Sequence, residues 1–175
     1  MRVFIAAELP QETVQQVKKI QHAVRQLPGT QTCTQHFHLT FLFLGEQQPH
    51  RVKEIGQALS SLHFSPLTCH IRSSGTFEYK GQPRVTFLKV EPQEPLEALH
   101  EAIVTLTRFT HEFNHFSPHI TLSRVKNAPD EFKTQFAQIP LPLISFVINK
   151  IVLFQSIREP LGHVYKRLFT VEAHD

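Results

Sequence analysis

The stretch FHLTFLFLG, residues 37–45, is the strongest structural signal in this chain of 175 residues. It is a dense apolar and aromatic run that ends at Gly45, which predicts a central, buried strand. A shorter stretch, PHITLSR at residues 118–124, predicts a second strand that begins after Pro118. Both strands start with the same tetrad, His38-Leu39-Thr40-Phe41 and His119-Ile120-Thr121-Leu122.

Strands and helices alternate around these two strands. Further strands are expected over 2–8, 66–72, 84–90, 142–155 and 163–171, and helices over 11–27, 50–62, 95–109 and 130–137. The turn Lys80-Gly81-Gln82-Pro83 separates two of the strands, and Gly162 is expected to turn between the last two. This order predicts an α+β fold. Residues 1–175 are expected to form a single domain of two similar lobes, roughly 1–80 and 81–175.

Composition excludes several classes of protein. With 15 Phe and only 19% charged residues, the chain is not mainly disordered. No apolar run approaches the roughly 20 residues that a bilayer span needs. The first eight residues resemble a strand rather than a signal peptide, so a cytoplasmic location is expected. In that reducing compartment, Cys33 and Cys69 are predicted to be free thiols. The net charge of +3 permits an anionic ligand.

The alternation of a strand gives the two tetrads a chemical meaning. Residues i and i+2 share a face, so His38 and Thr40 point one way, and His119 and Thr121 do the same. Two facing imidazoles suit displacement at a phosphodiester, since one accepts a proton from water and the other protonates the leaving oxygen. The threonine hydroxyls can donate to the non-bridging phosphate oxygens. This chemistry requires no metal or other cofactor.

Other interpretations of the histidines stay open. Two half-buried strand histidines with local hydrogen bonds would show the same spacing. The chain carries twelve His, and His111-Glu112-Phe113-Asn114-His115 matches the zinc-protease pattern H-E-x-x-H. That pattern needs a continuous helix and a third ligand, whereas Pro118 follows within three residues. A module that holds a nucleotide or an RNA end without catalysis is a further alternative.

The sequence resembles the two-histidine (2H) phosphoesterases, and among them the LigT-type RNA 2′,3′-cyclic phosphodiesterases. The matching stretches are RVFIA (2–6), FHLTFLFLGE (37–46), FSPHITLSR (116–124) and, more weakly, LFQS (153–156) with Gly162 and Tyr165. The resemblance implies a bilobal fold in which two pseudo-symmetric antiparallel sheets flank a central groove, with helices outside. It implies opening of a terminal 2′,3′-cyclic phosphate on RNA to a 2′-phosphomonoester, and 2′–5′ RNA ligation as related chemistry.

The resemblance also implies roles for individual residues. His119 would activate the attacking water as the proton acceptor, and His38 would protonate the departing O3′ as the proton donor. Thr40 and Thr121 would hold the phosphate. Arg124 occupies the place of a phosphate-binding arginine, although plain alternation turns it to the opposite face. It reaches the site only if the strand ends or bulges near Ser123.

Expected partners are RNA ends or small cyclic-phosphate nucleotides, bound by a monomer without a membrane or a metal. A 2H enzyme acting on 2′–5′ oligoadenylate or another cyclic nucleotide is an open alternative. The chain has no Trp, so a base-stacking surface must use Phe or Tyr. The candidates are Phe37, Phe77, Tyr79 and Phe116. A basic rim for RNA phosphates is expected from Lys80, Arg84, Lys89 and Lys126.

Overall fold

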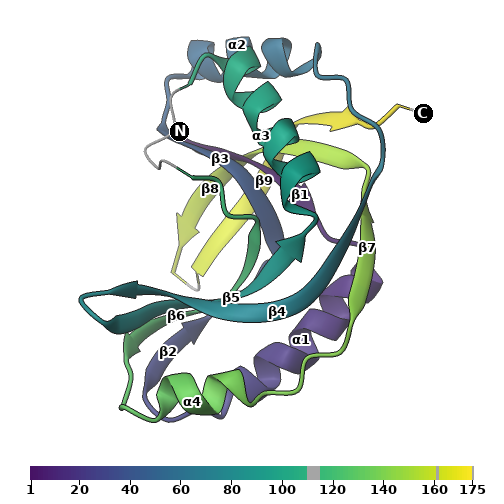
Figure 1. The fold of residues 1–175 in the computed structure, drawn as a ribbon. Coiled ribbons are helices and arrows are strands. Elements are labelled where there is room, and N and C mark those ends of the chain that lie inside the picture. Colours follow the sequence, from purple (N-terminus) through teal and green to yellow (C-terminus); the bar gives the residue numbers. More distant parts are fainter. Residues whose placement is uncertain (110–114, 161, 175) are drawn as a thin grey trace.

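The structure, a computed structural model, describes residues 1–109, 115–160 and 162–174. Its elements follow the order β1 (Arg2–Glu8), α1 (Gln11–Arg25), β2 (Thr30–Cys33), β3 (His38–Glu46), α2 (Pro49–Leu59), β4 (Leu67–Tyr79), β5 (Gln82–Glu91), α3 (Gln93–Thr107), β6 (His119–Asn127), α4 (Phe132–Ala137), β7 (Ile144–Ile148), β8 (Lys150–Glu159) and β9 (Gly162–Glu172). The strands form a curled sheet, and the helices stand outside it (Figure 1). Within the described ranges, no helix has both the length and the apolar character that crossing a membrane demands.

The sheet consists of two antiparallel halves that meet along β3 and β6. The strand order is β7-β4-β5-β6-β3-β1-β8-β9, and β2 pairs with β6 outside this path. The halves are joined by one ladder pair, Leu39 with Ile120. The predicted α+β fold with two antiparallel sheets is therefore confirmed, and the structure adds that this pair makes the two sheets continuous.

The helices cover one face of each half and leave the other face open. In Figure 1, α2 and α3 lie at one end of the molecule, and α1 and α4 lie at the other. The apolar positions that predicted α1, such as Val17 and Val24, are fully buried against the sheet together with Leu39 and Ile120. Burial of each such side chain contributes about 1.5–3 kcal/mol. We call the sheet face opposite the helices the open face.

The element order repeats about the middle of the chain. Residues 1–80 contain β1-α1-β3-α2-β4, and residues 81–175 contain β5-α3-β6-α4-β8, with β2, β7 and β9 as additions. The third strand of each series pairs with the first strand of the other, because β4 pairs with β5 and β8 pairs with β1. We propose that residues 1–175 are one domain of two pseudo-repeat lobes that exchange these strands.

The strand predicted over 142–155 was wrong, because this run contains two strands. Asn149 separates β7, which pairs with β4, from β8, which pairs with β1. The chain thus crosses from one half of the sheet to the other inside a continuous apolar run, where hydrophobicity marks no boundary. Gly162, which was predicted to turn between the last two strands, pairs with Glu159 at the end of the β8–β9 ladder and is the first residue of β9. Its φ of 136° is consistent with a turn at this end of the ladder. The short strand β2 was not predicted.

The strand predicted over 66–72 continues to Tyr79, so that β4 and β5 form a long hairpin. Its turn is Lys80–Gly81, with φ angles of 51° and 75°. Positive φ at both positions is typical of the two-residue type I′ turn, whose twist matches that of the paired strands. Figure 1 shows that this β4–β5 hairpin projects beyond the rest of the sheet.

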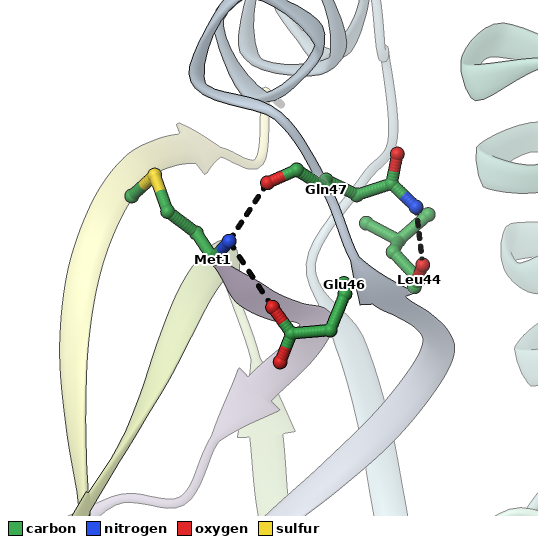
Figure 2. Close-up of polar contacts among 4 residues, drawn as sticks. All are labelled: Met1, Leu44, Glu46 and Gln47. Carbon is green, nitrogen blue, oxygen red and sulfur yellow. Dashed lines mark hydrogen bonds and ion pairs between the residues drawn. The ribbon is translucent and has the colours of Figure 1, made fainter.

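The ladder between β1 and β3 ends in a set of polar contacts (Figure 2). The Met1 ammonium donates to the Gln47 carbonyl at 2.8 Å and lies 3.2 Å from the Glu46 carboxylate. The Gln47 amide donates to the Leu44 carbonyl. These contacts hold the end of β3 that is farther from His38.

Candidate active site

The two His-x-Thr tetrads lie side by side at the starts of β3 and β6. Leu39 and Ile120 pair across the strands and are fully buried on the helix-covered face. His38 and Thr40, and likewise His119 and Thr121, are half-buried on the open face. In an antiparallel pair centred on Leu39 and Ile120, each histidine lies across from the threonine of the other tetrad. Diagonal positions are about 7–8 Å apart in a regular ladder, which leaves room for a phosphate group between the imidazoles.

His38 is held in a desolvated, aromatic environment. Burial lowers its pKa to about 4; a hydrogen bond to the backbone of His36 opposes this shift, whereas His119 and the His36 side chain add to it. The ring lies 5.1 Å from Phe4 and 5.3 Å from Tyr165 between centroids. Its electrostatic interaction with His119 agrees with the closeness of the two tetrads.

His119 has a matching backbone contact. Its Nδ1–H donates to the Ser117 carbonyl at 2.7 Å, which leaves Nε2 of the neutral ring free to accept a proton. Burial lowers the pKa of His119; this hydrogen bond opposes the shift, and Arg124 adds to it. Both histidines therefore bond to the backbone two residues before them and keep the other ring nitrogen available.

We expect the lowered pKa of His38 to make the protein less stable in mild acid. The unfolded histidine takes up a proton below pH 6.5, whereas the folded one stays neutral down to about pH 4. This stability is therefore present above pH 6.5 and lost as the pH falls toward 4, by about 2–3 kcal/mol at pH 4.5. Urea unfolding at pH 7.5 and 4.5 should show a smaller pH effect in His38→Gln than in the wild type. An equal effect in both proteins would contradict this account.

Arg124 lies on the open face because β6 bulges. Thr121 pairs with Phe87 and Ser123 pairs with Thr86, so that Leu122 is an extra residue in the ladder. The bulge returns Arg124 to the face of His119, and the guanidinium influences the pKa of both His119 and Tyr165. The bulge that the sequence required for Arg124 to reach the site is thus confirmed.

A buried polar network holds this bulge. The Leu122 carbonyl accepts the Thr34 N–H at 2.9 Å and the Gln21 Nε2–H at 2.8 Å, and the same amide also donates to the Thr34 carbonyl. On the next residue, the Ser123 hydroxyl lies 2.7 Å from Thr86 Oγ1. These contacts satisfy backbone and side-chain groups that are buried next to the bulge, so Gln21 of α1 stabilises the bulge that precedes Arg124.

β3 contains the equivalent bulge. Ile5 pairs with Leu42 and Ala6 pairs with Thr40, so that Phe41 is the extra residue. Its carbonyl accepts Nδ1–H of the buried His100 of α3 at 2.8 Å. The bulge turns Phe43 to the open face, where it is 62% exposed. Phe43 and Arg124 thus occupy equivalent positions, five residues after their histidines, but offer a phenyl ring and a guanidinium.

Each histidine is flanked by aromatic side chains. The His38 flank consists of Phe4, Phe43 and Tyr165, where Phe4 contacts both other rings within 6.2 Å between centroids. The His119 flank consists of Phe77, Phe87 and Tyr79 from the β4–β5 hairpin. Phe77 stacks on Phe87 at 4.2 Å, and its ring meets that of His119 edge-on at 4.9 Å.

The stacking candidates of the sequence divide between surface and core. Phe77 and Tyr79 are 37% and 59% exposed beside His119. Phe37 is buried in the core. Phe116 packs against the core, and its ring stacks on that of His100. The prediction that these two rings stack on a base was therefore wrong. Sequence reasoning missed the His38 flank, although Phe43 stands at the same offset from its histidine as Arg124.

The four residues of the expected basic rim are all exposed. Lys89 pairs with His119 in the β5–β6 ladder and therefore shares the open face. Lys80 lies at the hairpin tip, with Nζ 5.4 Å from the centre of the Tyr79 ring. Arg84 donates to the Lys126 carbonyl at 3.3 Å, at the other end of the β5–β6 ladder.

The structure also describes the two cysteines and the surroundings of most of the histidines. Cys33 and Cys69 are free, as predicted. Among the residues with described positions, no group of three or more His, Cys, Asp or Glu could hold a metal ion. Residues 111–114 of the H-E-x-x-H match lie outside the described residues, so the structure does not test the zinc interpretation.

Comparisons with known proteins agree on one family. A family model described as the 2′-5′ RNA ligase superfamily matches residues 6–159. Proteins named RNA 2′,3′-cyclic phosphodiesterase are 31% identical in Thermotoga maritima, over 97% of this chain and 94% of the relative, and in Thermus thermophilus, over 94% and 86%. A crystal structure of a Thermus thermophilus protein matches with a TM-score of 0.76 at 29% identity, covering 98% of this chain and 97% of the other. E. coli LigT, solved with 3′-AMP, has the same fold (TM-score 0.76, 20% identity, coverage 99% and 98%).

Proposed function

Because the chain belongs to the 2′-5′ RNA ligase superfamily, we propose that it is an RNA 2′,3′-cyclic phosphodiesterase. It opens a terminal 2′,3′-cyclic phosphate to a 2′-phosphomonoester without a metal or other cofactor. The observation that carries this proposal is the meeting of the two His–Thr pairs on one face, at the only ladder pair described between β3 and β6. The relatives named for this activity span almost the whole chain.

The histidines, the threonines and the arginine of the site have separate roles in the reaction. His119 accepts the proton of the attacking water at Nε2, since its Nδ1–H is bonded to the Ser117 carbonyl. His38 gives a proton to the departing O3′, which breaks the P–O3′ bond and leaves the phosphate on O2′. Thr40 and Thr121 donate to the non-bridging oxygens, and the Arg124 guanidinium neutralises their charge.

The negative charge of the substrate favours the protonated form of His38. Without a ligand, the lowered pKa values leave both imidazoles neutral near pH 7. A cyclic phosphodiester carries one negative charge, and an opposite charge within about 4–6 Å favours the protonated imidazole. Binding therefore raises the pKa of His38 toward neutrality, where it can act as a proton donor.

We expect Thr40→Ala and Thr121→Ala each to lower kcat for a nucleoside 2′,3′-cyclic phosphate by about 10²-fold, because each change removes one donor to the charged oxygens. Thr→Ser at either position keeps the hydroxyl and should retain most of the activity. Steady-state kinetics on the four variants measure this. A Thr→Ser variant as slow as its Thr→Ala counterpart would show that the methyl group, rather than the hydroxyl, is what matters.

The proposed function is tested with a short RNA that ends in a 2′,3′-cyclic phosphate, incubated with the protein in EDTA. A gain in mass of one water and a phosphatase-sensitive 2′-phosphate are the expected products. Tight binding without turnover would favour a module that only holds RNA ends. Turnover that EDTA abolishes would favour a metal mechanism.

The monomeric state stays a prediction. We propose RNA ends or small cyclic-phosphate nucleotides as its ligands, on the basis of the basic and aromatic open face. The cytoplasmic location stays a prediction.

A further inference from the structure

The two histidines of the site have ladder neighbours of opposite charge. Glu8 of β1 pairs with His38, and Lys89 of β5 pairs with His119. Both neighbours lie on the open face, because the residue before each of them is fully buried in the core. Directly opposite residues of an antiparallel ladder have Cβ atoms about 4.5–5.5 Å apart, so each charged side chain begins beside one imidazole.

The two His–Thr pairs are themselves alike. Each offers one imidazole and one hydroxyl, and each imidazole bonds to the backbone two residues before it. The phosphate of a bound substrate lies between the rings, so its negative charge favours the protonated form of both. The substrate alone therefore does not select the ring that carries the proton, and this selection must come from the surroundings of the two rings.

We propose that Glu8 and Lys89 set the direction of proton transfer. Glu8 favours the protonated form of His38, the donor, and Lys89 favours the neutral form of His119, the acceptor. Both act through the histidines and are therefore positioning residues. The inference rests on the proposed function and names the groups that assign the two roles within the same site.

The Glu8 carboxylate is held on the open face by an ion pair. Its Oε1 lies 2.9 Å from Nε and 2.8 Å from Nη2 of Arg167 on β9. In the strand order β3-β1-β8-β9, neighbouring strands are about 4.8 Å apart, so Arg167 reaches Glu8 from the side away from His38. The Arg167 side chain is 66% exposed and that of Glu8 is 34% exposed, so water screens the guanidinium more strongly. The carboxylate is thus the nearer and less screened charge beside His38.

The other groups around His38 supply no negative charge near pH 7. His36 and His119 oppose a positive charge on this ring. The Tyr165 ring lies 5.3 Å away, and burial raises the pKa of its hydroxyl, which therefore stays neutral. β1 and β6 flank β3, and Glu8 is the one acidic residue in these two strands.

The charges beside His119 are positive. The Lys89 side chain is exposed, and within the described ranges it forms no ion pair. The nearest carboxylate on β5 belongs to Glu91, which lies opposite His70 and about 7 Å farther along the same face. The Arg124 guanidinium is a second cation, and it contributes to the lowered pKa of His119. Both cations disfavour a positive charge on this ring.

NMR titration of the histidine rings tests the proposal in the complex with cytidine 2′-phosphate, the product of the proposed reaction. His38→Gln and His119→Gln identify the two ring signals among those of the twelve histidines. Glu8→Gln should lower the pKa of His38 by about 0.5–1, the effect of one charge about 6 Å away in a partly exposed site, and should leave His119 unchanged. Lys89→Gln should raise the pKa of His119 by a similar amount.

A variant of Arg167 distinguishes an electrostatic role from a structural one. Glu8→Gln and Arg167→Gln break the same ion pair, so a purely structural role would move the pKa of His38 in the same direction in both. Under the proposal the directions are opposite, because Arg167→Gln leaves the carboxylate without its counter-charge and raises the pKa of His38. Glu172→Gln breaks the exposed ion pair with Lys150 and is the control for the change in net charge.

The pH dependence of kcat for cytidine 2′,3′-cyclic phosphate is the functional measurement. In Glu8→Gln the alkaline limb, which reports the proton donor, should move to lower pH. Equal directions in Glu8→Gln and Arg167→Gln, or no change in either, overturn the proposal and leave the proposed function intact. If Glu8→Gln does not fold, an unchanged His38 in Arg167→Gln together with an unchanged His119 in Lys89→Gln overturns it. A wild type that neither binds cytidine 2′-phosphate nor hydrolyses the cyclic phosphate overturns the proposed function.

Discussion

His38→Ala and His119→Ala are each expected to lower kcat for cyclic-phosphate hydrolysis by about 10³–10⁴-fold while the protein stays folded. Each change removes one partner of a proton-transfer pair, a contribution of about 10²–10⁴-fold, and also removes a ring that helps to desolvate the site. Because the two imidazoles act in one step, the double variant should be little slower than either single variant.

Exposed His63 provides the matched control, because His63→Ala removes an imidazole whose only described hydrogen bond joins it to the Ser61 carbonyl. Circular dichroism and thermal unfolding of all variants show whether the fold is intact. A folded His38→Ala or His119→Ala protein with near wild-type turnover would refute the two-histidine mechanism.

A modified substrate separates the donor from the acceptor. If sulfur replaces the 3′ oxygen of the cyclic phosphate, the leaving thiolate needs little protonation. We expect His38→Ala to recover at least ten-fold of its lost rate on this substrate and His119→Ala to recover none. The opposite pattern would exchange the two roles.

The sequence predicted the chemistry of the site better than its surroundings. Alternation within one strand is local, so the sequence alone could place His38 with Thr40, and His119 with Thr121, on one face. That the two strands would be neighbours depended on pairing between residues about 80 positions apart, for which only the repeated tetrad gave a signal. The His38 flank was missed because Phe4, Phe43 and Tyr165 come from three strands that meet only in the folded sheet.

The bulges in β3 and β6 could not be predicted from the sequence either. A bulge inverts every later side chain of its strand, and no residue type in the stretches 38–44 or 119–125 announces one. Its stabilising contacts come from helices, since Gln21 and His100 bond the carbonyls of Leu122 and Phe41. A glutamine or histidine on the buried face of a predicted helix interrupts its apolar pattern. Only the structure shows that each of these side chains hydrogen-bonds to a strand that is distant in the sequence.

Arg124→Ala should lower kcat/KM by about 10²–10³-fold, because it removes a charged donor from the phosphate. Arg124→Lys should recover part of the loss, since an amine supplies charge without the fork of the guanidinium. Thr32→Ala, at the residue that pairs with Arg124 on β2, is the control for disturbance of the ladder. Equal activity of Arg124→Ala and the wild type would place the arginine outside the reaction.

A substitution at Gln21 tests whether the bulge in β6 orients Arg124. Gln21→Leu removes the buried amide that donates to Leu122 and Thr34, so the free energy of unfolding should fall by about 1–3 kcal/mol. If the bulge acts by aiming Arg124, Gln21→Leu should also lower kcat/KM in the wild type but add nothing in the Arg124→Ala background. Independent, multiplying losses would mean that the network supports the fold alone. A loss confined to the wild-type background would instead link a side chain in the core of α1 to the charge beside the phosphate, through one extra residue in a strand.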